Sequence, residues 1–337
     1  RLLPHATPLQ VMRIVDAGGA DGQARAVRDF DAADISDAPF GWNVPNWLLR
    51  REMAARIADL EGVAFRPGVG TAQVLTRQDE ALVTLSDGSR HAARLLVAAD
   101  GRDSPVRRAT GISVRTFRYG QKALSFAVTH PIPHANVSTE VHRTGGPFTL
   151  VPLPDRDGRP ASAVVWMETA AEAQRLAALP VAAFETAMAD RSAHVLGPLT
   201  LASPRQVWPV IGQVAARMAG ERVALMAEAA HVVPPIGAQG LNMSMADLGA
   251  LIDLDASDPA ALGTPDMLDR YHRRRHPEVL ARVIGVDLLN RASMAGAQPL
   301  RDLRLAALNA LYGVPMVRRT LMRAGMGAGM GAGPAAA

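Results

Sequence analysis

The sequence predicts a mixed α/β protein in which one α/β region is interrupted by a separate sheet lobe. Two apolar strand patterns, ARLLVAA and RVALMA, end close to an acidic residue and lead into helical patterns. Between them, short alternating strands are separated by Pro, Gly and Asp, and the last part of the chain is helical. Because strands buried on both faces lack alternation, we expect the two apolar runs in the interior of the α/β region.

The first part of the chain predicts a strand, a helix and three further strands. VMRIV (11–15) reads as a strand before the turn-rich DAGGADG, and 42–60 reads as a short strand running into a helix. Residues 71–99 contain QVLT, ALVTL and ARLLVAA, of which the last is apolar throughout and is expected to be buried. Helical spacing predicts the buried stripe of the 42–60 helix as Leu48, Leu49, Met53 and Ile57.

The middle of the chain predicts a sheet lobe with helical cover. LSFAVTH, STEVHR, FTLVPL and SAVVWME read as strands, and a helix over about 170–190 should be kinked or broken at Pro180. RVALMA (222–227) returns to a buried strand, and helices follow to about 323. The tail 324–337 is of low complexity, and we expect it to be disordered.

Composition excludes several classes of protein. The net charge of +4 and the aromatic content of 4% argue against a nucleic-acid binder. The absence of cysteine excludes disulfide scaffolds, thiolate metal sites and cysteine nucleophiles, and it fits a reducing cytoplasm. No apolar run reaches about 18 residues, so the sequence predicts no membrane span. The N-terminus lacks both a signal-peptide pattern and Met, which suggests a fragment or a processed form.

The stretch LLVAADGRDSPVRRATGI (95–112) places polar residues directly after a buried strand. Asp100 can hydrogen-bond a ribose or polyol hydroxyl there, and Gly101 allows the backbone to approach closely. Ser104 can cap a helix that begins at Pro105, and Arg107 would then face a phosphate. An ordinary strand–turn–helix joint has the same spacing, so both interpretations stay open at this point.

The stretch EAAHVVPPIGAQGLNMSMADLGALI (228–252) repeats this arrangement after the second buried strand. Glu228 supplies another carboxylate, and the segment carries no formal charge from there to Asp247. The loop leads into a helix, whose first N–H groups and partial positive charge suit an anionic group. A flavin dinucleotide fits both stretches, with its ribityl chain at the carboxylates and its reduced ring at the helix. The residues with the spacing of one helical face are Leu241, Met245, Leu248 and Ile252.

These two motifs resemble the flavin-dependent aromatic hydroxylases, the FAD monooxygenases. DGxxSxxR and EAAHVVPPIGAQGLN stand in the family's order, and the likeness to the branch that hydroxylates ubiquinone precursors extends to YGQKA, PFTLVPLPD and the C-terminal YHRRRHPEVLARVIGVDLLNR. The likeness covers nearly the whole chain. It implies an FAD/NAD(P)-binding Rossmann-like domain with an inserted β-sheet substrate lobe and C-terminal helices.

The chain departs from the family pattern at several positions. Ala227 and Glu228 stand where the family has Gly-Asp, and Ala238 replaces a frequent Gly. Trp47 stands where an Arg near the cofactor phosphates is frequent, and Arg50 or Arg51 is a possible substitute. The family's opening GxGxxG unit is absent, because RPGVGTAQ and the tail GMGAGMG lack its strand–helix context. We therefore expect the family fold without its first βαβ unit.

The resemblance implies an oxidoreductase that hydroxylates an aromatic ring, expected to be a ubiquinone precursor. The family uses FAD, NADPH or NADH, and O2, through a flavin C4a-hydroperoxide. No catalytic residue is assigned; Pro235 and His231 are expected near the flavin ring, Val232–Ile236 as an apolar wall, and no metal ligands are proposed. The cofactor-binding residues that the motifs imply are Asp100, Gly101, Ser104, Arg107, Glu228, Pro235, Gly237, Ala238, Gln239, Gly240, Leu241 and Asn242.

The expected domains follow from the same likeness. They are two parts of an FAD-binding domain (1–111 and 216–270), a substrate-binding sheet lobe (112–215), C-terminal helices (271–323) and the tail (324–337). Within the lobe, an aromatic-binding surface and an ordinary core are equally compatible with Phe126, Phe148, Leu150 and Trp166.

The expected partners are an aromatic or quinone-precursor molecule, O2, and a membrane surface or a ubiquinone-biosynthesis complex, with no nucleic acid. The expected location is cytoplasmic, and LRLAALNALYGVPMVRRTLMR has the composition of an interfacial helix that would make the protein peripheral on the inner membrane. A packed terminal helix is an equal alternative for that segment.

Two alternative functions stay open: an FAD-dependent reductase of the same fold that inserts no oxygen, and a catalytically incompetent fragment. One further pair of side chains, His272 and His276, has i,i+4 spacing, but three arginines lie between them. A solvated basic face is favoured there over a metal site.

Overall fold

The computed structural model describes residues 1–19 and 23–326, which form two compact units. The first, called here the sheet unit, comprises residues 1–63, 120–210 and those from 290 onward. The second, called here the motif unit, comprises residues 64–119 and 211–289, and it contains both sequence motifs. The tail from 327 to 337, for which we predicted disorder, lies outside the described residues.

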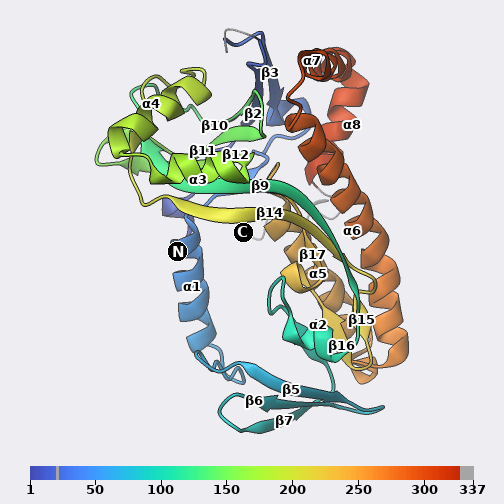
Figure 1. The fold of residues 1–337 in the computed structure, drawn as a ribbon. Helices are drawn as coiled ribbons and strands as arrows, with labels where there is room; N and C mark the ends of the chain where they lie inside the picture. Colours follow the sequence, from blue (N-terminus) through green and yellow to red (C-terminus); the bar gives the residue numbers. More distant parts are fainter. Residues whose placement is uncertain (20–22, 327–337) are drawn as a thin grey trace. The chain divides into compact units, whose positions relative to one another are not determined.

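The largest sheet is built around the strands that the sequence predicted for the middle of the chain. Its strand order is β17-β14-β9-β12-β11-β10-β2-β3, and β9 and β14 each run through both units (Figure 1). All its strand pairs with printed register are antiparallel except β10 with β2, which is parallel and joins the N-terminal strand VMRIV to the lobe. The bounds are β2 (Val11–Asp16), β3 (Ala26–Asp31), β9 (Val114–Thr129), β10 (Val137–His142), β11 (Pro147–Arg156), β12 (Arg159–Thr169), β14 (Gln206–Ala215) and β17 (His231–Val232), with β13 (Thr200–Leu201) beside β9.

Helices α3 (Ala170–Ala178) and α4 (Val181–Arg191) cover one face of this sheet within the sheet unit (Figure 1). Pro180 separates them, as the sequence predicted, because proline cannot continue a helix from within. The aromatic residues of the lobe lie beneath these helices in the core: Phe148 and Trp166 meet edge to face with ring centroids 5.3 Å apart. Of the two readings left open for Phe126, Phe148, Leu150 and Trp166, the structure supports the core.

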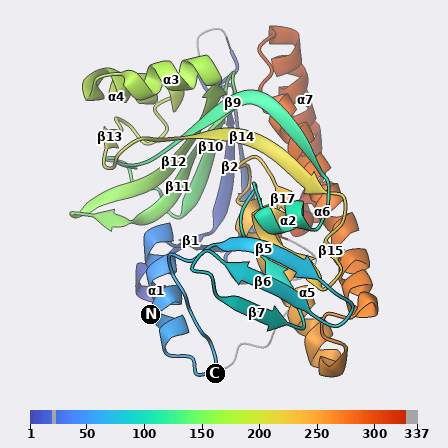
Figure 2. The ribbon, with the colours of Figure 1, turned by 60° about the horizontal axis from the view of Figure 1, so that its bottom comes forward.

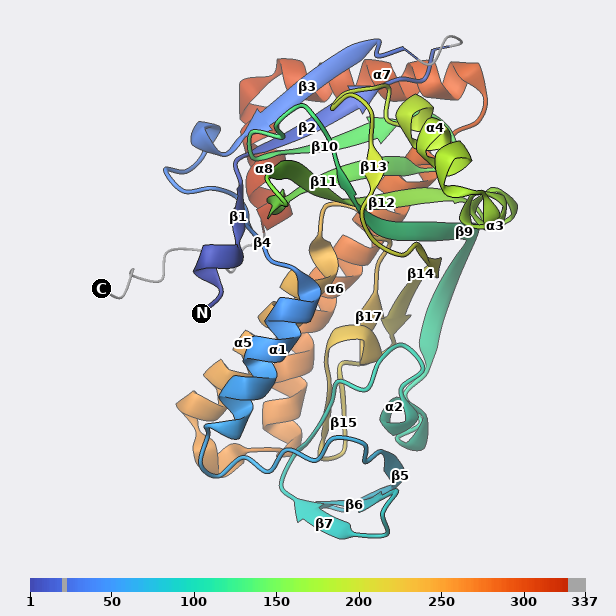
Figure 3. The ribbon, with the colours of Figure 1, turned by 90° about the vertical axis from the view of Figure 1, so that its left-hand side faces the viewer.

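Helices α7 (Gln298–Gly313) and α8 (Pro315–Met326) lie at the β3 end of the same unit (Figure 3). Tyr312 of α7 meets Phe30 of β3 edge to face, with ring centroids 5.5 Å apart. Arg28 of β3 and Arg318 of α8 both stack over the Tyr312 ring. These contacts fix the C-terminal helices to the sheet edge.

The N-terminal part of the sheet unit contains a two-stranded sheet and one helix. β1 (Thr7–Leu9) pairs with β4 (Gly41–Asn43), and α1 (Asn46–Ala58) follows, as predicted. The predicted buried stripe of α1 is wrong in part: Leu48 is buried, but Met53 is 54% exposed. Only the first turn of α1 packs against the interior, so helical spacing alone overestimated the buried face. Short 3₁₀ turns complete this region at η1 (Leu3–His5) and η2 (Ala32–Asp34).

The motif unit has a small sheet of order β15-β16-β8, in which β16 (Val223–Leu225) and β8 (Leu96–Ala98) run parallel. A separate antiparallel sheet contains β5 (Thr71–Thr76), β6 (Ala81–Leu85) and β7 (Arg90–Ala93) (Figure 2). The prediction of one wholly buried strand over ARLLVAA is wrong, because β7 and β8 divide this stretch and Val97 is 42% exposed. In the described residues β8 pairs on one edge alone, so part of its surface stays open.

Helices form most of the rest of the motif unit. They are α2 (Pro105–Ala109), α5 (Gln239–Ser257), α6 (Pro265–Ser293, whose end belongs to the sheet unit), η3 (Ala227–Ala229) and η4 (Pro259–Ala261), with β15 at Ala219–Gly220. The buried residues of α5 are Met243, Asp247, Ala250, Leu251 and Leu254. The apolar stripe noted in the sequence, from Leu241 to Ile252, lies on the exposed face instead. Among the described helices, none is both long and apolar enough to cross a membrane.

Candidate functional site

The two acidic residues of the motifs emerge at the same edge of one sheet. β8 and β16 are adjacent and parallel, with Ala98 opposite Leu225, so both strands end together. Asp100 follows β8 by two residues and Glu228 follows β16 by three. Arg102 bridges the two loops, with its Nε 3.3 Å from a carboxylate oxygen of Glu228. The carboxyl edge of parallel strands is where α/β sheets bind ligands, and here it carries two exposed carboxylates.

The turn after β8 has the cap that the sequence predicted. Ser104 accepts a hydrogen bond from the backbone N–H of Arg107 at 2.9 Å, and Pro105 occupies the first position of α2. Asp100 accepts from the backbone N–H of Val106 at 3.1 Å. Gly101 has φ of +87°, a conformation that other residues rarely adopt, and nothing lies within 4 Å of where a Cβ would be. The turn is therefore fixed by its own hydrogen bonds and open on its outer side.

Arg107 holds the two motifs together. Its guanidinium is buried and donates to the carbonyl oxygens of Ala229 and Arg102, each at 2.7 Å. Burial lowers the pKa of Arg107 from its ordinary value, with a nearby positive charge on Arg108 adding to the effect. In this structure Arg107 joins the DG turn to the loop after β16, and a contact with a phosphate stays a prediction.

The second motif bends through three left-handed residues before α5 begins. Ala227, Gly237 and Ala238 have φ of +53°, +65° and +52°. Alanine is strained in this region, which is consistent with the family's glycines at the two alanine positions. Helix α5 begins at Gln239 with no acidic residue in its first turn, and the space around Gly240 is open. The start of this helix is therefore an open surface with the partial positive charge that suits an anionic ligand.

The individual side chains of the second loop are placed as follows. Gln239 donates to the carbonyl of Gly237 at 3.0 Å and accepts from Arg282 at 2.7 Å, and Asn242 donates to the carbonyl of Ala238 at 3.2 Å. Pro235 is exposed, whereas Val232, Pro234 and Ile236 are buried. The predicted apolar wall is thus packed inward for the most part, with Pro235 at its surface.

Beneath the second motif lies a buried charged network that the sequence analysis missed. Asp247 is fully buried; its Oδ2 lies 2.7 Å from Nε2 of His231 and accepts from the backbone N–H of Ala227 at 3.1 Å. Its Oδ1 accepts from Nε of Arg275 at 2.9 Å. The signal for this network was a lone carboxylate on the helix face that also carries Met243 and Leu251. In this structure His231 is therefore a hydrogen-bonding residue at the loop entrance, and its place near the flavin ring stays a prediction.

Helix α6 supplies the rest of this support. Tyr271 is buried and donates to the carbonyl oxygen of Leu225, at the end of β16, at 2.9 Å. Burial and the nearby charge of Asp247 raise the pKa of Tyr271, so the hydroxyl stays protonated as a donor. The interpretation of 272–276 as a solvated basic face is wrong in part. Arg275 points inward, and His272 accepts from the backbone N–H of Met218 at 3.3 Å.

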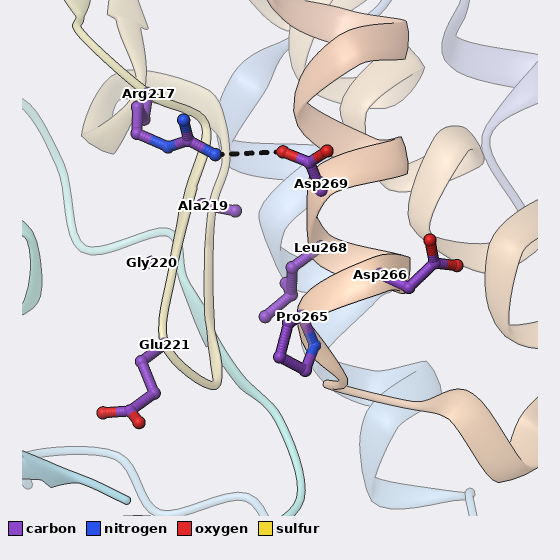
Figure 4. A pocket seen from close by; sticks show the side chains of 8 residues that line it. All are labelled: Arg217, Ala219, Gly220, Glu221, Pro265, Asp266, Leu268 and Asp269. Carbon is purple, nitrogen blue, oxygen red and sulfur yellow. Dashed lines mark hydrogen bonds and ion pairs between the residues drawn. The ribbon is translucent and has the colours of Figure 1, made fainter. Parts of the chain in front are cut away.

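A separate open cavity of about 640 Å³ lies in the same unit (Figure 4). Arg217 and Asp269 form an ion pair at 3.2 Å across it, and Glu221 and Asp266 lie at its rim. It has no element of either motif in its lining. The two motif loops thus form the candidate site.

Comparison with known proteins identifies the class of this site. The family model for the FAD binding domain matches residues 2–284. The chain belongs to this FAD-binding family. The family resemblance, the mixed α/β fold and the enzyme class, an FAD-dependent monooxygenase, are thereby confirmed.

Relatives with curated functions include several ubiquinone hydroxylases. The chain is 31% identical to "Ubiquinone hydroxylase UbiL" of Rhodospirillum rubrum over 93% of its own length and 73% of that protein. It is 26% identical to "3-demethoxyubiquinol 3-hydroxylase" of Escherichia coli, covering 88% of the chain and 76% of the relative. The mouse "Ubiquinone biosynthesis monooxygenase COQ6, mitochondrial" is 28% identical, with 90% and 72% covered.

Solved structures show the same fold. The p-nitrophenol 4-monooxygenase PnpA of Pseudomonas putida superimposes with a TM-score of 0.76 at 17% identity, covering 96% of this chain and 81% of that one. PqsL of Pseudomonas aeruginosa, in complex with 2-aminobenzoylacetate, gives a TM-score of 0.73 at 23% identity, covering 90% and 82%. At these identities the likeness concerns the fold alone.

Proposed function

We propose that this monooxygenase hydroxylates the aromatic ring of a ubiquinone precursor, with NADPH or NADH as electron donor and O2 as oxygen source. The observation that carries the proposal is the meeting of Asp100 and Glu228 at one sheet edge, beside the open start of α5. The ubiquinone hydroxylases among the relatives support the substrate class.

The residues of both loops fit FAD. We assign Asp100 and Glu228 to hydroxyl groups of the cofactor, because both carboxylates are exposed. The N–H groups from Gly237 to Asn242 lie at the open start of α5 and suit the edge of the ring that becomes negative on reduction. Bound FAD supplies the oxygen-transfer chemistry; the protein binds it, orients it and excludes water with residues such as Pro235. Ser104 and Arg107 are buried and stabilise the two loops through their hydrogen bonds.

The substrate is proposed to bind to the sheet unit on the face opposite α3 and α4. The aromatic residues considered in the sequence are core residues beneath those helices, so they are not available. The opposite face carries a row of half-buried residues from four adjacent strands, namely Glu140, Thr149, Val165 and Ser125, with Trp208 beyond them. Trp208 is 52% exposed and donates to the hydroxyl of Ser125 at 3.2 Å, and its ring offers an apolar surface to an aromatic ligand.

We further propose that α7 and α8 touch a membrane surface or a partner in ubiquinone biosynthesis, which would make a cytoplasmic protein peripheral on the inner membrane. Leu303 and Met316 are 64% and 79% exposed, and Arg319 and Arg323 are exposed on the same terminal segment. Co-sedimentation with anionic vesicles should fall in the pair of variants Leu303→Asp and Met316→Asp. Equal co-sedimentation of variant and parent would remove the membrane part of the proposal.

The test of the cofactor site is FAD binding by variants of matched exposure. The purified protein should show bound-flavin absorption or take up added FAD. Glu228→Ala should weaken FAD binding about tenfold, the loss of one charge-assisted hydrogen bond. Glu221→Ala is the control, because Glu221 is an exposed Glu of the same unit that bonds Thr76 instead. A colourless protein that takes up no FAD, or equal binding by both variants, contradicts the assignment.

A further inference from the structure

The face of the sheet unit opposite α3 and α4 carries an acid–histidine pair on β10. The pair lies beside Asp16 of β2, which is opposite His142 and pairs with Arg25 and with Arg304 of α7. Glu140 and His142 are two residues apart on β10, so both side chains point to the same face. The carboxylate oxygen Oε1 of Glu140 lies 2.6 Å from Nε2 of His142. Their side chains are 13% (His142) and 16% (Glu140) exposed, so the pair is largely buried yet still reaches the surface of this face.

Register places this pair in the row of polar and apolar residues described above. Glu140 lies directly opposite Thr149 on β11, and Thr149 lies opposite Val165 on β12. Directly opposite residues have Cβ atoms about 4.5–5.5 Å apart, so the hydroxyl of Thr149 lies within reach of the pair. The neighbouring residue Val141 points the other way, into the core beneath α3 and α4. Ser138, Glu140 and His142 therefore lie on the face of β10 opposite to Val141.

Two polar atoms of this cluster are buried without a hydrogen-bond partner in the described residues: Nδ1 of His142 and Oγ1 of Thr149. Buried polar atoms in folded proteins are nearly always paired, so two orphans on one face call for an explanation. With Glu140 ionised, the Nε2–H of His142 donates to the carboxylate and leaves Nδ1 as a free acceptor. Thr149 can supply a free donor. A ligand oxygen bound at this cluster would meet an acceptor on His142 and a donor on Thr149.

We propose that His142 and Glu140 are the proton-accepting pair for the hydroxyl group of a phenolic substrate, with Thr149 donating to the same oxygen. This inference deepens the proposed function and rests on it. During reaction the phenol O–H bond breaks and an Nδ1–H bond forms on His142, directly or through one water. The electron pair stays on the oxygen and is delocalised into the ring, which makes the ring a better nucleophile. Glu140 stabilises the imidazolium cation that results, as a carboxylate does in acid–histidine pairs generally.

The arrangement also indicates why the pair is built into a sheet. Strand pairing fixes the backbone of both β10 and β11 on either side of the cluster, so the acceptor and donor keep a constant separation. Sites on strands hold a geometry better than sites on loops do. A substrate without a ring hydroxyl would leave both orphan atoms unpaired, so the site selects phenols.

The experiment uses the FAD-loaded enzyme and 4-nitrophenol, whose phenolate is coloured and whose neutral form is not. Difference spectra against pH report how much of the bound probe is ionised. In the parent enzyme the bound probe should be more ionised than free probe at the same pH. In His142→Gln the ratio of phenolate to phenol should fall at least tenfold, and in Glu140→Gln it should fall less. His134→Gln is the matched control, because that half-buried histidine of the same unit bonds the carbonyl of Leu153.

Thr149→Val separates a ligand role from a structural one. Valine has nearly the same shape and removes a buried hydroxyl that has no partner, so thermal stability should be kept or increased while 4-nitrophenol binding weakens severalfold. If the hydroxyl had a structural role, the Thr149→Val variant would instead be less stable than the parent.

Three outcomes overturn the inference: no saturable binding of 4-nitrophenol, the same ionisation of bound probe in His142→Gln as in the parent, or loss of stability without loss of binding in Thr149→Val. Failure of the proposed function would be observed differently, as the absence of bound FAD or of ring hydroxylation. The probe titration measures the pair independently of turnover, so the two failures are distinguishable.

Discussion

Two regions of the molecule bury polar groups in opposite ways. In the motif unit both carboxylate oxygens of Asp247 are paired, with His231, Arg275 and the backbone of Ala227. On the face of the sheet unit opposite α3 and α4, Nδ1 of His142 and Oγ1 of Thr149 are buried without a partner in the described residues. Only the first region has all of these polar atoms paired within the described residues.

The difference distinguishes a network that supports a loop from a cluster that is proposed to contact the substrate. A fully paired buried network holds backbone in place, and here it holds the strained loop that carries Glu228. Unpaired buried atoms cost free energy, and a ligand that pairs them recovers it, which is the basis of the proposal for His142 and Thr149. This contrast agrees with the two proposals, in which the Asp247 network positions the proposed FAD-binding residues and the His142 cluster binds the substrate.

The largest expected effect is on the paired network. Asp247→Ala leaves Arg275 and His231 buried without their partner, which should lower the free energy of unfolding by about 3–5 kcal/mol. Denaturant unfolding monitored by circular dichroism measures it. Asp253→Ala is the control on the same helix, because its ion pair with Arg274 is exposed and should be worth about 0–1 kcal/mol. Equal losses for the two variants would break the comparison.

Next in size is the link between the two motif loops. Arg107→Met removes both hydrogen bonds to Ala229 and Arg102 and should cost about 1–3 kcal/mol, together with weaker FAD binding. Arg108→Met is the matched control, since Arg108 is exposed and bonds only the carbonyl of Asp103 among the contacts described. FAD titration and unfolding of both variants test this. If Arg107→Met bound FAD as tightly as the control, FAD binding would not depend on the hydrogen bonds by which Arg107 links the two loops.

A pH experiment probes a paired network in the sheet unit. Burial raises the pKa of Asp16, but hydrogen bonds from Arg25, the backbone of Gly18 and Arg304 outweigh it and hold the pKa below 3.8. The native state then binds fewer protons than the unfolded state, so the stabilisation is complete above about pH 3.8 and is lost as pH falls through the native pKa. Each unit of lowering is worth about 1.4 kcal/mol.

The variant Asp16→Asn removes this titrating group. The difference in unfolding free energy between parent and variant should therefore shrink as the pH falls from neutrality to below the native pKa. A difference that is independent of pH would show that the carboxylate contributes no charge-dependent stability.

The smallest effect concerns the predicted cap. Ser104→Ala leaves the N–H of Arg107 without its acceptor and should cost about 1 kcal/mol. Ser244→Ala is the control, because Ser244 bonds the carbonyl of Gly240 inside α5, where alanine is the better helix former. Thermal unfolding of both variants tests this. A lower stability of Ser104→Ala alone is expected, and an unchanged stability of Ser104→Ala would contradict the capping role.

Local patterns predicted what depends on neighbours in the chain. The strands of the sheet lobe, the break at Pro180 and the Ser104 cap follow from backbone chemistry within a few residues, and the structure confirms them. The meeting of Asp100 and Glu228 was implied by fitting one flavin to both stretches, and the parallel pairing of β8 with β16 brings the two strand ends together.

Tertiary contacts explain what the sequence could not predict. Asp247 and Arg275 lie on different helices, and no periodicity connects a carboxylate with a guanidinium 28 positions away. Val97 and Met53 have apolar side chains but stay exposed, because burial depends on which element covers a face. The same limit left the core and surface readings of Phe148 and Trp166 open until the position of α3 was known.

The central claim is that this FAD-dependent enzyme inserts oxygen into an aromatic ring. The most direct measurement supplies the FAD-loaded enzyme with NAD(P)H, isotopically labelled O2 and a ubiquinone-precursor phenol, and analyses the product by mass spectrometry. The account predicts a hydroxylated ring that carries one labelled oxygen atom for each NAD(P)H consumed. Consumption of NAD(P)H with a reduced, unlabelled product would contradict it and identify a reductase of the same fold.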